Sequence, residues 1–279
     1  MADTNGGGAG DGGNGNNHRP LPPSPPVPSD PAAKANLEAC LASPTYVLAQ
    51  QDLVFLARRE LRGVRLMLEL EKADTQMDQE GIRTTVVVFG GARLKEGDRW
   101  YEEAREFGRI VSACQASGMC DFVITTGGGP GAMEAANRGA WDSGAKSVGF
   151  NIQLPHEQWP NAYITPSLCF KFHYFGIRKM HLLMRARALV AFPGGYGTLD
   201  ELFETLTLVQ TGKMKRVPIV LVGRAYWEKL INWQMLVDEG GIAPEDLGLI
   251  SWAENAAEAW DAIVAFYARH PSPSGSVLR

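Results

Sequence analysis

The stretch that decides the fold reads ALVAFPGGYGTLDE and spans residues 188–201. It opens with five apolar residues of the kind that form a buried strand, passes into a glycine-rich turn, and continues into a helical pattern. A second stretch, TVVVFGGAR at residues 85–93, begins in the same way. Apolar strands followed directly by turns and helices are typical of a parallel sheet that is covered on both faces.

Further apolar runs repeat this pattern along the chain, and segments with a helical period lie between them. The sequence therefore predicts an α/β protein with a Rossmann-like, doubly wound parallel sheet and helices on both faces. A last helix is expected over about residues 256–269. The expected strands cover residues 85–89, 122–125, 147–150, 188–192 and 217–222.

The two ends of the chain differ in composition from this central part. The first 35 residues hold 7 of the 31 glycines and 7 of the 17 prolines, so we predict a disordered tail over residues 1–35. A helical extension is predicted over residues 36–80, because apolar residues recur near the helical period from Thr45 to Gln76. This helix is expected to pack outside the α/β domain or against a partner subunit. The α/β domain is predicted over residues 81–271, followed by a flexible C-terminus over 272–279.

The composition is that of a globular protein with a sizeable core, since 45% of the 279 residues are hydrophobic and 21% are charged. A net charge of −4 provides no basic field for nucleic acid, and no apolar run approaches the roughly 20 residues that span a bilayer. The first residues lack the features of a secretory signal, and four scattered cysteines indicate reduced thiols. We therefore expect a cytoplasmic protein with no nucleic-acid or membrane partner. No metal is expected, because no cluster of ligand residues has a suitable spacing.

Three of the expected strands run directly into glycine, at residues 90–93, 126–131 and 193–198. Glycine lets the backbone approach a ligand closely, and the helix that follows offers unpaired N–H groups to an anion. Ligands of doubly wound sheets bind beyond the carboxyl ends of the strands. Any one of the three could be only a tight strand-to-helix turn, but their repetition at one end of the sheet predicts a shared phosphate-binding crevice.

The kind of phosphate ligand follows from what the turns lack. Gly127, Gly129 and Ala132 match the loose dinucleotide fingerprint, but this match follows the second strand and not the first. The next strand ends near Asn151, with no acidic residue placed to bind a ribose. The chain also lacks the GxxxxGK[ST] motif of a nucleoside-triphosphate loop. A mononucleotide therefore fits the sequence better than NAD or ATP.

Two groups of charged residues lie close to the third turn. Thr198 and Glu201 have the spacing of a helix capping box, in which Glu201 would only reach back to the N–H of Thr198; alternatively, its carboxylate serves a ligand. The segment 170–187 is predicted as a helix with a basic stripe, which is either a solvated face or a border of the crevice. In the second case Arg178 and Lys179 could bind phosphate. The stripe comprises Tyr174, Arg178, His181 and Arg185, and the opposite side carries Phe175, Leu182 and Leu183.

Together these residues resemble the LOG (Lonely Guy) family, whose members are often labelled possible lysine decarboxylase. The family signature PGGxGTxxE is met in full by residues 193–201, and its upstream Arg-Lys pair is met by Arg178 and Lys179. GGGPGAMEAAN at residues 127–137 and NIQLPHEQ at residues 151–158 are similar to the longer bacterial branch. The resemblance extends from the first strand to the final helix.

The resemblance implies hydrolysis of the N-glycosidic bond of a nucleoside 5′-monophosphate, giving the free base and ribose 5-phosphate. The base would be adenine or a cytokinin-type purine, and neither a cofactor nor a metal would be needed. Arg178 and Glu201 would form the catalytic pair, and a homo-oligomer of two or more copies is expected. The implied substrate-binding residues are Gly127, Gly128, Gly129, Glu157, Lys179, Gly194, Gly195, Tyr196, Gly197, Thr198, Asp200 and Thr207.

Elementary chemistry agrees with this implied reaction. Cleavage of a ribosyl C–N bond builds positive charge on the sugar, which Glu201 could stabilise while the turn at 194–198 anchors the phosphate. The alternative is a non-catalytic nucleotide-binding or sensing module on the same fold. A pyridoxal-dependent lysine decarboxylase is not expected, because no lysine has the context of a Schiff-base residue.

Overall fold

The computed structural model of the chain describes residues 28–155 and 159–270. Glu157, the predicted tail up to residue 27 and the predicted C-terminal segment 272–279 lie outside these residues. None of the helices within the described ranges is both long enough and apolar enough to cross a bilayer. The chain divides into two compact units, Met1–Ala57 and Arg58–Arg279, and the second unit contains the sheet.

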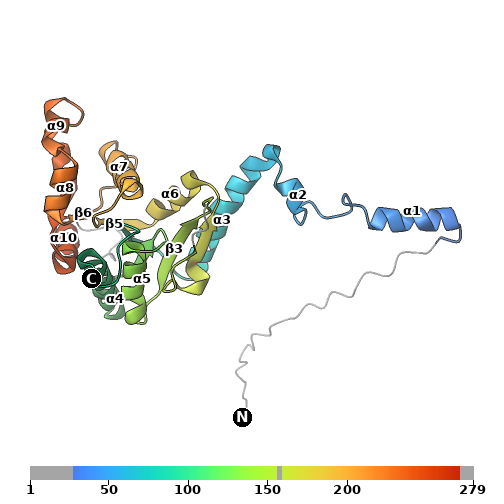
Figure 1. Ribbon diagram of the computed structural model, residues 1–279, viewed down its shortest axis with the longest axis horizontal. Coiled ribbons are helices and arrows are strands. Elements are labelled where there is room, and N and C mark those ends of the chain that lie inside the picture. The colour runs from blue at the N-terminus through green and yellow to red at the C-terminus, as the bar shows by residue number, and fades with distance from the viewer. Residues whose placement is uncertain (1–27, 156–158, 271–279) are drawn as a thin grey trace, which may run out of the picture. The chain divides into compact units, whose positions relative to one another are not determined.

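The second unit is built on a seven-stranded sheet in which every neighbouring pair of strands is parallel (Figure 1). The strand order is β4-β3-β2-β1-β5-β6-β7, so the chain builds outward from β1 on one side and then from β5 on the other. The predicted doubly wound fold is thereby confirmed. The strands are β1 (Thr84–Phe89), β2 (Phe122–Thr126), β3 (Ser147–Ile152), β4 (Cys169–Phe172), β5 (Ala186–Ala191), β6 (Ile219–Val222) and β7 (Ile250–Ala253).

Both edge strands of the sheet are absent from the predicted set, which corresponds to β1, β2, β3, β5 and β6. The segment 170–187, expected to be one helix, instead contains the end of β4 followed by α6 (Phe175–Met184). In β4 the phenylalanines are buried and Lys171 is exposed, so a strand of four residues carries too little pattern to be distinguished from a helix. Three of the four residues of β7 are partly exposed, so this strand also lacks a continuous apolar run.

The central strands are apolar on both faces, and their alternate residues contribute to two different cores. In β1, Val86 and Val88 pack in the core formed with α4, α5 and α10. Val87 and Phe89 pack in the core formed with α3, α6, α7 and α8, which confirms helices on both faces (Figure 1). These helices are α3 (Arg62–Gln79), α4 (Arg99–Ala116), α5 (Ala132–Asp142), α7 (Tyr196–Gln210), α8 (Arg224–Leu230) and α10 (Ala256–Arg269). The unit also contains the short helix α9 (Trp233–Asp238) and three 3₁₀ turns, η1 (Arg59–Leu61), η2 (Pro166–Leu168) and η3 (Pro244–Leu249).

The limit of the predicted tail at residue 35 differs from the structure. Helix α1 (Pro31–Leu41) begins inside the segment that was expected to be disordered. The Asp30 side chain accepts a hydrogen bond from the N–H of Ala32 at 3.0 Å and caps this helix. The proline that follows the cap is favoured at the first helical position, so the sequence signal for this start lay within the proline-rich segment itself.

The single helix predicted over residues 45–76 is not formed. The Asp52 side chain accepts a hydrogen bond from the N–H of Phe55 at 2.8 Å and starts the short helix α2 (Leu53–Leu56). Helix α3 begins only at Arg62, and its Ala73 and Met77 lie in the core of the sheet. Helix α3 therefore belongs to the α/β unit, which begins at Arg58 and not at the predicted residue 81.

Helices α4 and α5 approach each other closely through two glycines. A Cβ atom added to Gly139 would lie 2.9 Å from the backbone nitrogen of Arg109 and 2.9 Å from the Cα of Gly108. A Cβ atom added to Gly108 would in turn lie 3.1 Å from the Cα of Gly139. Protein interiors have no spare volume for such groups, so glycine at these positions sets the distance between the two helices.

Gly139→Ala should lower the free energy of unfolding by about 1–3 kcal/mol, because the backbone of α4 would have to move. Gly63→Ala is the matched control, since Gly63 lies in helix α3 and an added Cβ would meet no atom within 4 Å. The control should raise the free energy of unfolding by about 0.5–1 kcal/mol through helix propensity. Urea denaturation measures both values. Effects of the same sign in both variants would contradict the close packing of α4 on α5.

Candidate active site

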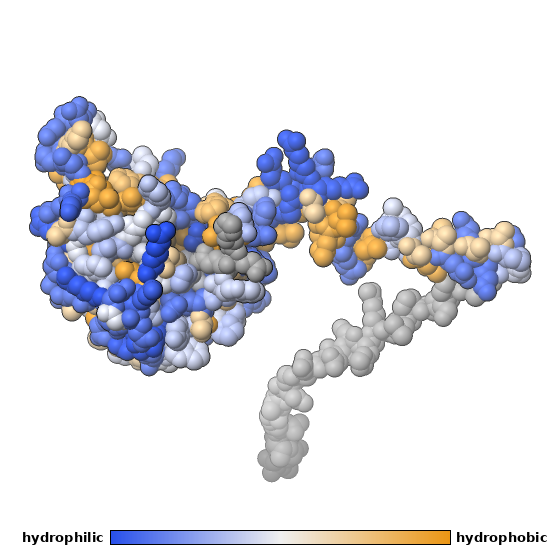
Figure 2. Space-filling view, viewed as in Figure 1, coloured by the Kyte–Doolittle hydropathy of each residue, from blue (hydrophilic) through white to orange (hydrophobic). Residues whose placement is uncertain are grey.

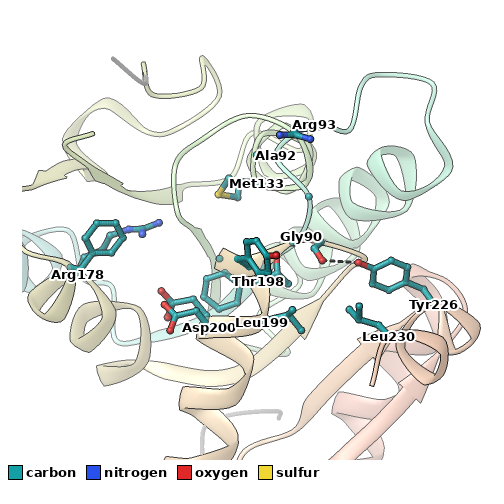
Figure 3. Close-up of a pocket in the computed structure, with 18 residues that line it drawn as sticks. Gly90, Ala92, Arg93, Met133, Arg178, Thr198, Leu199, Asp200, Tyr226 and Leu230 are labelled. Atoms are coloured by element: carbon teal, nitrogen blue, oxygen red, sulfur yellow. Dashed lines mark hydrogen bonds between the residues drawn. The ribbon is translucent and has the colours of Figure 1, made fainter. Parts of the chain in front are cut away.

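A cavity of about 620 Å³ opens at the carboxyl end of the sheet, where the strand order reverses between β1 and β5 (Figure 3). Ligands of doubly wound sheets bind at this position, because the connections that leave the two strands diverge there. The walls come from the turns after β1 and β5, from the start of α7, and from α5, α6 and α8. The lining residues are 89–93, Met133, Phe175, Arg178, 194–201, Tyr226 and Leu230.

The turn after β5 presents bare backbone to this cavity. Gly195 is the N-cap of α7, so the first amide groups of the helix have no intrahelical acceptor. Gly195 and Gly197 have no positive φ, and an added Cβ at either would meet no atom within 4 Å. An N-cap accepts glycine readily, whereas glycine inside a helix costs about 1 kcal/mol relative to alanine. Packing therefore requires neither residue, and helix propensity disfavours Gly197. Access of a ligand to the amide groups does explain them.

Two hydrogen bonds and one close contact hold this turn in place. The N–H of Gly91, after β1, donates to the carbonyl oxygen of Pro193 at 2.9 Å and joins the two turns. The hydroxyl of Tyr226 donates to the carbonyl oxygen of Gly194 at 2.7 Å from the opposite wall (Figure 3). A side chain at Gly194 would overlap that of Thr198, so glycine is required there for steric reasons.

Arg178 enters the cavity from α6 (Figure 3), and strand β3 fixes its guanidinium. Its Nε–H donates to the carbonyl oxygen of Phe150 at 2.7 Å. A side chain at Gly127 would overlap the guanidinium, so this predicted binding residue makes room for Arg178 and does not itself line the cavity. Burial lowers the pKa of Arg178, and the carboxylates of Glu201 and Asp200 oppose that effect.

Glu201 is a buried carboxyl group that lines the cavity from α7. The residue is only 4% exposed, and its Oε2 atom has no hydrogen-bond partner among the described residues. Burial raises the pKa of Glu201 to about 7, although Lys179 and Arg178 oppose this rise. A carboxyl group that titrates near neutral pH inside a cavity is suited to act on a ligand as a charge or as an acid–base group.

The capping-box interpretation of Thr198 and Glu201 is wrong. Helix α7 begins at Tyr196, so Thr198 is a residue of its first turn and not the N-cap. The N–H of Thr198 donates to the carbonyl oxygen of Gly195 at 3.0 Å and needs no bond from Glu201. The alternative, in which the Glu201 carboxyl serves the crevice, agrees with its place in the cavity wall.

The predicted phosphate ligand Lys179 is absent from the described lining of the cavity. Successive helical residues point about 100° apart, so Arg178 and Lys179 face in different directions. The ammonium of Lys179 contacts the carboxylates of Asp200 at 2.9 Å and Glu204 at 3.1 Å, both on α7. Burial alone would lower the pKa of Lys179, but its hydrogen bonds to Asp200 and Glu204 raise it. Asp200, a predicted binding residue, lines the cavity while it is paired with Lys179.

Three further predicted binding residues, Gly128, Gly129 and Thr207, are not part of the cavity lining, whereas the predicted residues 194–198 are. Gly128 and Gly129 are buried in the turn after β2, so only the turns after β1 and β5 share the crevice, and not all three. Thr207 lies farther along α7 in a shallow surface hollow, and its hydroxyl donates to the carbonyl oxygen of Phe203 at 2.7 Å. Glu157 lies outside the described residues.

The predicted basic stripe is not a single functional face. His181 is buried on the inner side of α6, where its ring packs against Phe150 and Phe172, and this burial lowers its pKa. Arg185 lies beyond the end of α6, and its guanidinium pairs with Asp78 of α3 at 2.8 Å. Of the predicted stripe, Arg178 alone lines the described cavity. Phe175, expected on the opposite side, also lines the cavity and is 52% exposed.

Several lining residues were not predicted to bind a ligand. Met133 follows the glycine turn after β2, and Arg93 ends the turn after β1, so their positions next to strand ends were usable signals. Tyr226 and Leu230 lie in α8, which no sequence motif connects with the site. Figure 2 shows apolar side chains gathered where α7 faces α8 and α9. Tyr196, at the rim of the cavity, is 92% exposed.

The cavity offers three kinds of contact to a ligand. The start of α7 and the guanidinium groups of Arg93 and Arg178 suit an anion. The Glu201 carboxyl suits hydroxyl groups or positive charge. Met133 and Phe175 provide apolar surface against which a planar ring can pack. Across residues 28–155 and 159–270, no group of three or more His, Cys, Asp or Glu residues is arranged to hold a metal ion.

Known proteins match the part of the chain that carries this site. The family model described as possible lysine decarboxylase matches residues 133–263, which include Arg178 and Glu201. The cytokinin riboside 5′-monophosphate phosphoribohydrolase LOG7 of Arabidopsis thaliana is 41% identical over 83 residues, or 29% of this chain. The enzyme of the same name numbered LOG3, also from Arabidopsis thaliana, is 29% identical over 176 residues, which cover 62% of this chain and 78% of that protein.

These matches confirm the predicted relationship to the LOG family. The aligned region spans only 38% of the length of LOG7. Among solved structures, the molybdenum cofactor binding protein from the phototrophic bacterium Rippkaea orientalis has a TM-score of 0.47 at 17% sequence identity, and the alignment covers 66% of this chain and 97% of that one.

Glu201→Gln should raise the free energy of unfolding at neutral and alkaline pH. The pKa of Glu201 in the folded state, about 7, lies above its ordinary value of 4.5, so folding favours the protonated form. This stabilisation is full below about pH 4.5 and is lost as the pH rises through about 7. We therefore expect the variant to exceed the parent by up to about 3 kcal/mol near pH 8, and by almost nothing near pH 4.5.

Urea denaturation over this pH range measures the difference between variant and parent. Glu228→Gln is the control, because Glu228 is an exposed carboxylate on α8 that pairs with Arg224 at 2.7 Å. The control should show no gain near pH 8. A gain for Glu201→Gln that is equal at both ends of the pH range would show that Glu201 is not titrating as described.

Proposed function

We propose that the protein hydrolyses the N-glycosidic bond of a purine nucleoside 5′-monophosphate to the free base and ribose 5-phosphate. One observation carries this proposal: a buried carboxyl group, Glu201, shares a cavity with the bare amide groups at the start of α7. Arg178 completes the set from α6. The relatives named as cytokinin riboside 5′-monophosphate phosphoribohydrolases support the same reaction.

The 5′-phosphate of the nucleotide binds at the start of α7. The amide groups at Gly195 and Gly197 and the positive end of the helix dipole favour an anion there. Arg93, which lines the same cavity, adds positive charge from the turn after β1. Because the phosphate does not react, its binding energy holds the ribose in position for bond cleavage.

Glu201 acts where the charge of the reaction develops. As the C–N bond breaks, positive charge builds on C1 and the ring oxygen of the ribose. A carboxylate that is shielded from water stabilises such charge more strongly than a solvated one. With a pKa of about 7, a substantial fraction of Glu201 is ionised at neutral pH. Water adds to C1 and gives one proton to Glu201, and the departing base takes up one proton from solvent. Glu201 then returns its proton to solvent, so the net reaction consumes one water molecule.

Arg178 faces the sugar and the base. Its bond to the carbonyl oxygen of Phe150 fixes the guanidinium within the cavity, where it can bind ribose hydroxyls and assist the departure of the base. Met133 and Phe175 line the cavity beside it and suit a planar aromatic base. This apolar surface supports a purine and leaves the choice among purines to the shape of the pocket.

The cavity favours glycosidic cleavage over the decarboxylation that the name of the family model suggests. A pyridoxal-dependent decarboxylase needs a lysine that forms a Schiff base with the cofactor. Among the described residues that line the cavity, none is a lysine. Lys179, adjacent to Arg178 in sequence, is held between two carboxylates.

Incubation with AMP or N6-isopentenyl-AMP, followed by chromatography, should show release of the free base. Glu201→Gln and Arg178→Lys should each lower kcat/KM by about 10²–10⁴-fold, because one loses the buried charge and the other loses the bond to Phe150. Glu228→Gln, outside the cavity, should retain the parent's rate. Nucleotide binding without base release would reject the enzyme and favour a non-catalytic nucleotide-binding module.

Gly197→Ala should stabilise the fold and weaken the site at the same time. An added Cβ meets no protein atom, so helix propensity should raise the free energy of unfolding by about 0.5–1 kcal/mol. The same methyl group covers the start of α7, so ribose 5-phosphate should bind about tenfold more weakly by calorimetry. Gly63→Ala should give the stability gain alone. Unchanged binding of ribose 5-phosphate to Gly197→Ala would place the phosphate elsewhere.

A further inference from the structure

Lys179 connects the two helices that carry the proposed catalytic groups. It follows Arg178 on α6, and its ammonium contacts Asp200 and Glu204, which lie on either side of Glu201 in the sequence of α7. The side chain of Lys179 is 16% exposed, against 60% for that of Asp200, so the ammonium is largely withdrawn from water. Ion pairs of this kind are screened less than surface pairs and hold α6 and α7 together more firmly.

The charges that act on Glu201 come from both helices. Burial raises the pKa of Glu201, and Glu204 and Asp200 raise it further. Lys179 and Arg178 lower it, and Lys179 has the larger of these two effects. From the turn after β1, Arg93 also lines the cavity. Without Lys179, the three carboxyl groups at residues 200, 201 and 204 would share about one helical turn with less compensating charge.

We propose that Lys179 is a positioning residue that ties α6 to α7, keeps Arg178 and Glu201 in one cavity, and places a positive charge near the Glu201 carboxyl. Lys179 is not a ligand of the substrate phosphate. The effect of Lys179 on catalysis rests on the proposed function. The ion pairs of Lys179 and their effect on Glu201 are independent of the proposed function.

A role in binding phosphate would require Lys179 to leave both of its contacts. Its ammonium lies 2.9 Å from Asp200 and 3.1 Å from Glu204, and the described cavity wall does not include it. Moving the ammonium to the start of α7 would leave two carboxylates without a counter-charge next to Glu201. The amide groups of α7 and the Arg93 guanidinium already provide positive charge for an anion.

Two substitutions separate the charge of Lys179 from its bulk. Lys179→Met removes the charge and keeps the length of the side chain, whereas Lys179→Arg keeps the charge. For Lys179→Met, the acidic limb of the kcat/KM–pH profile with AMP should move upward by about half to one pH unit, because Glu201 ionises less readily. In Lys179→Arg, the acidic limb should lie at the same pH as in the parent. Calorimetry near pH 8.5 should show ribose 5-phosphate binding to both variants within about twofold of the parent.

Lys146→Met is the control, since it removes a lysine that pairs with Glu80 at 2.7 Å away from the cavity. It should change neither the pH profile nor the binding of ribose 5-phosphate. The proposal is overturned if Lys179→Met weakens ribose 5-phosphate binding tenfold or more while the acidic limb stays in place. That result would make Lys179 the phosphate ligand that the sequence predicts.

A third measurement tests Lys179 even if the parent releases no base from any nucleoside monophosphate. Near pH 7, Glu201→Gln should raise the free energy of unfolding more in the Lys179→Met background than in the parent, because the buried carboxyl has lost its main opposing charge. If no base is released but the gain in the free energy of unfolding is larger in the Lys179→Met background, only the proposed function is rejected. An equal or smaller gain would reject the role of Lys179.

Discussion

The site depends on one constraint: the fold keeps a carboxyl group away from water. Glu201 is 4% exposed, although an isolated buried carboxylate is strongly unfavourable. This burial is tolerated because Arg178 and Lys179 lie nearby, and because a pKa of about 7 allows the group to be partly protonated. The same burial makes the group useful, since a charge with little screening acts strongly on charge that develops in a bound ligand. Stability and the proposed chemistry therefore depend on the same contacts.

Strand β5 is the element that brings these contacts together. Helix α6 precedes β5 and α7 follows it, so Arg178 approaches the cavity from one connection and Glu201 from the other. The neighbouring strand β1 supplies the second turn, and the bond from the Gly91 N–H to the Pro193 carbonyl oxygen joins it to the first. Because the order of strands reverses between β1 and β5, the connections that leave these two strands diverge, and the cavity lies where they separate.

The sequence predicted the centre of the sheet and missed its edges for a physical reason. Central strands are buried on both faces and must be apolar throughout, whereas β4 and β7 carry partly exposed residues and resemble other segments.

The sequence also predicted only part of the site. Arg178 and Glu201 lie where the motifs placed them, but the spacing of Thr198 and Glu201 was equally compatible with a capping box. The capping box is excluded because α7 begins at Tyr196. Lys179 points toward α7, where its ammonium pairs with Asp200 and Glu204.

Glycine shows why a motif alone could not identify the ligand contacts. Gly127 makes room for a guanidinium and Gly194 for a threonine side chain, so the packing of the protein accounts for both. At Gly195 and Gly197 an added Cβ would meet no protein atom within 4 Å, and neither residue adopts a backbone conformation that requires glycine. These reasons are indistinguishable in the letters of the sequence and separate only in three dimensions. A glycine that nothing in the protein requires, at a helix start that lacks hydrogen-bond partners, indicates a ligand more directly than glycine content does. In this chain it indicates the same cavity as the buried carboxyl group.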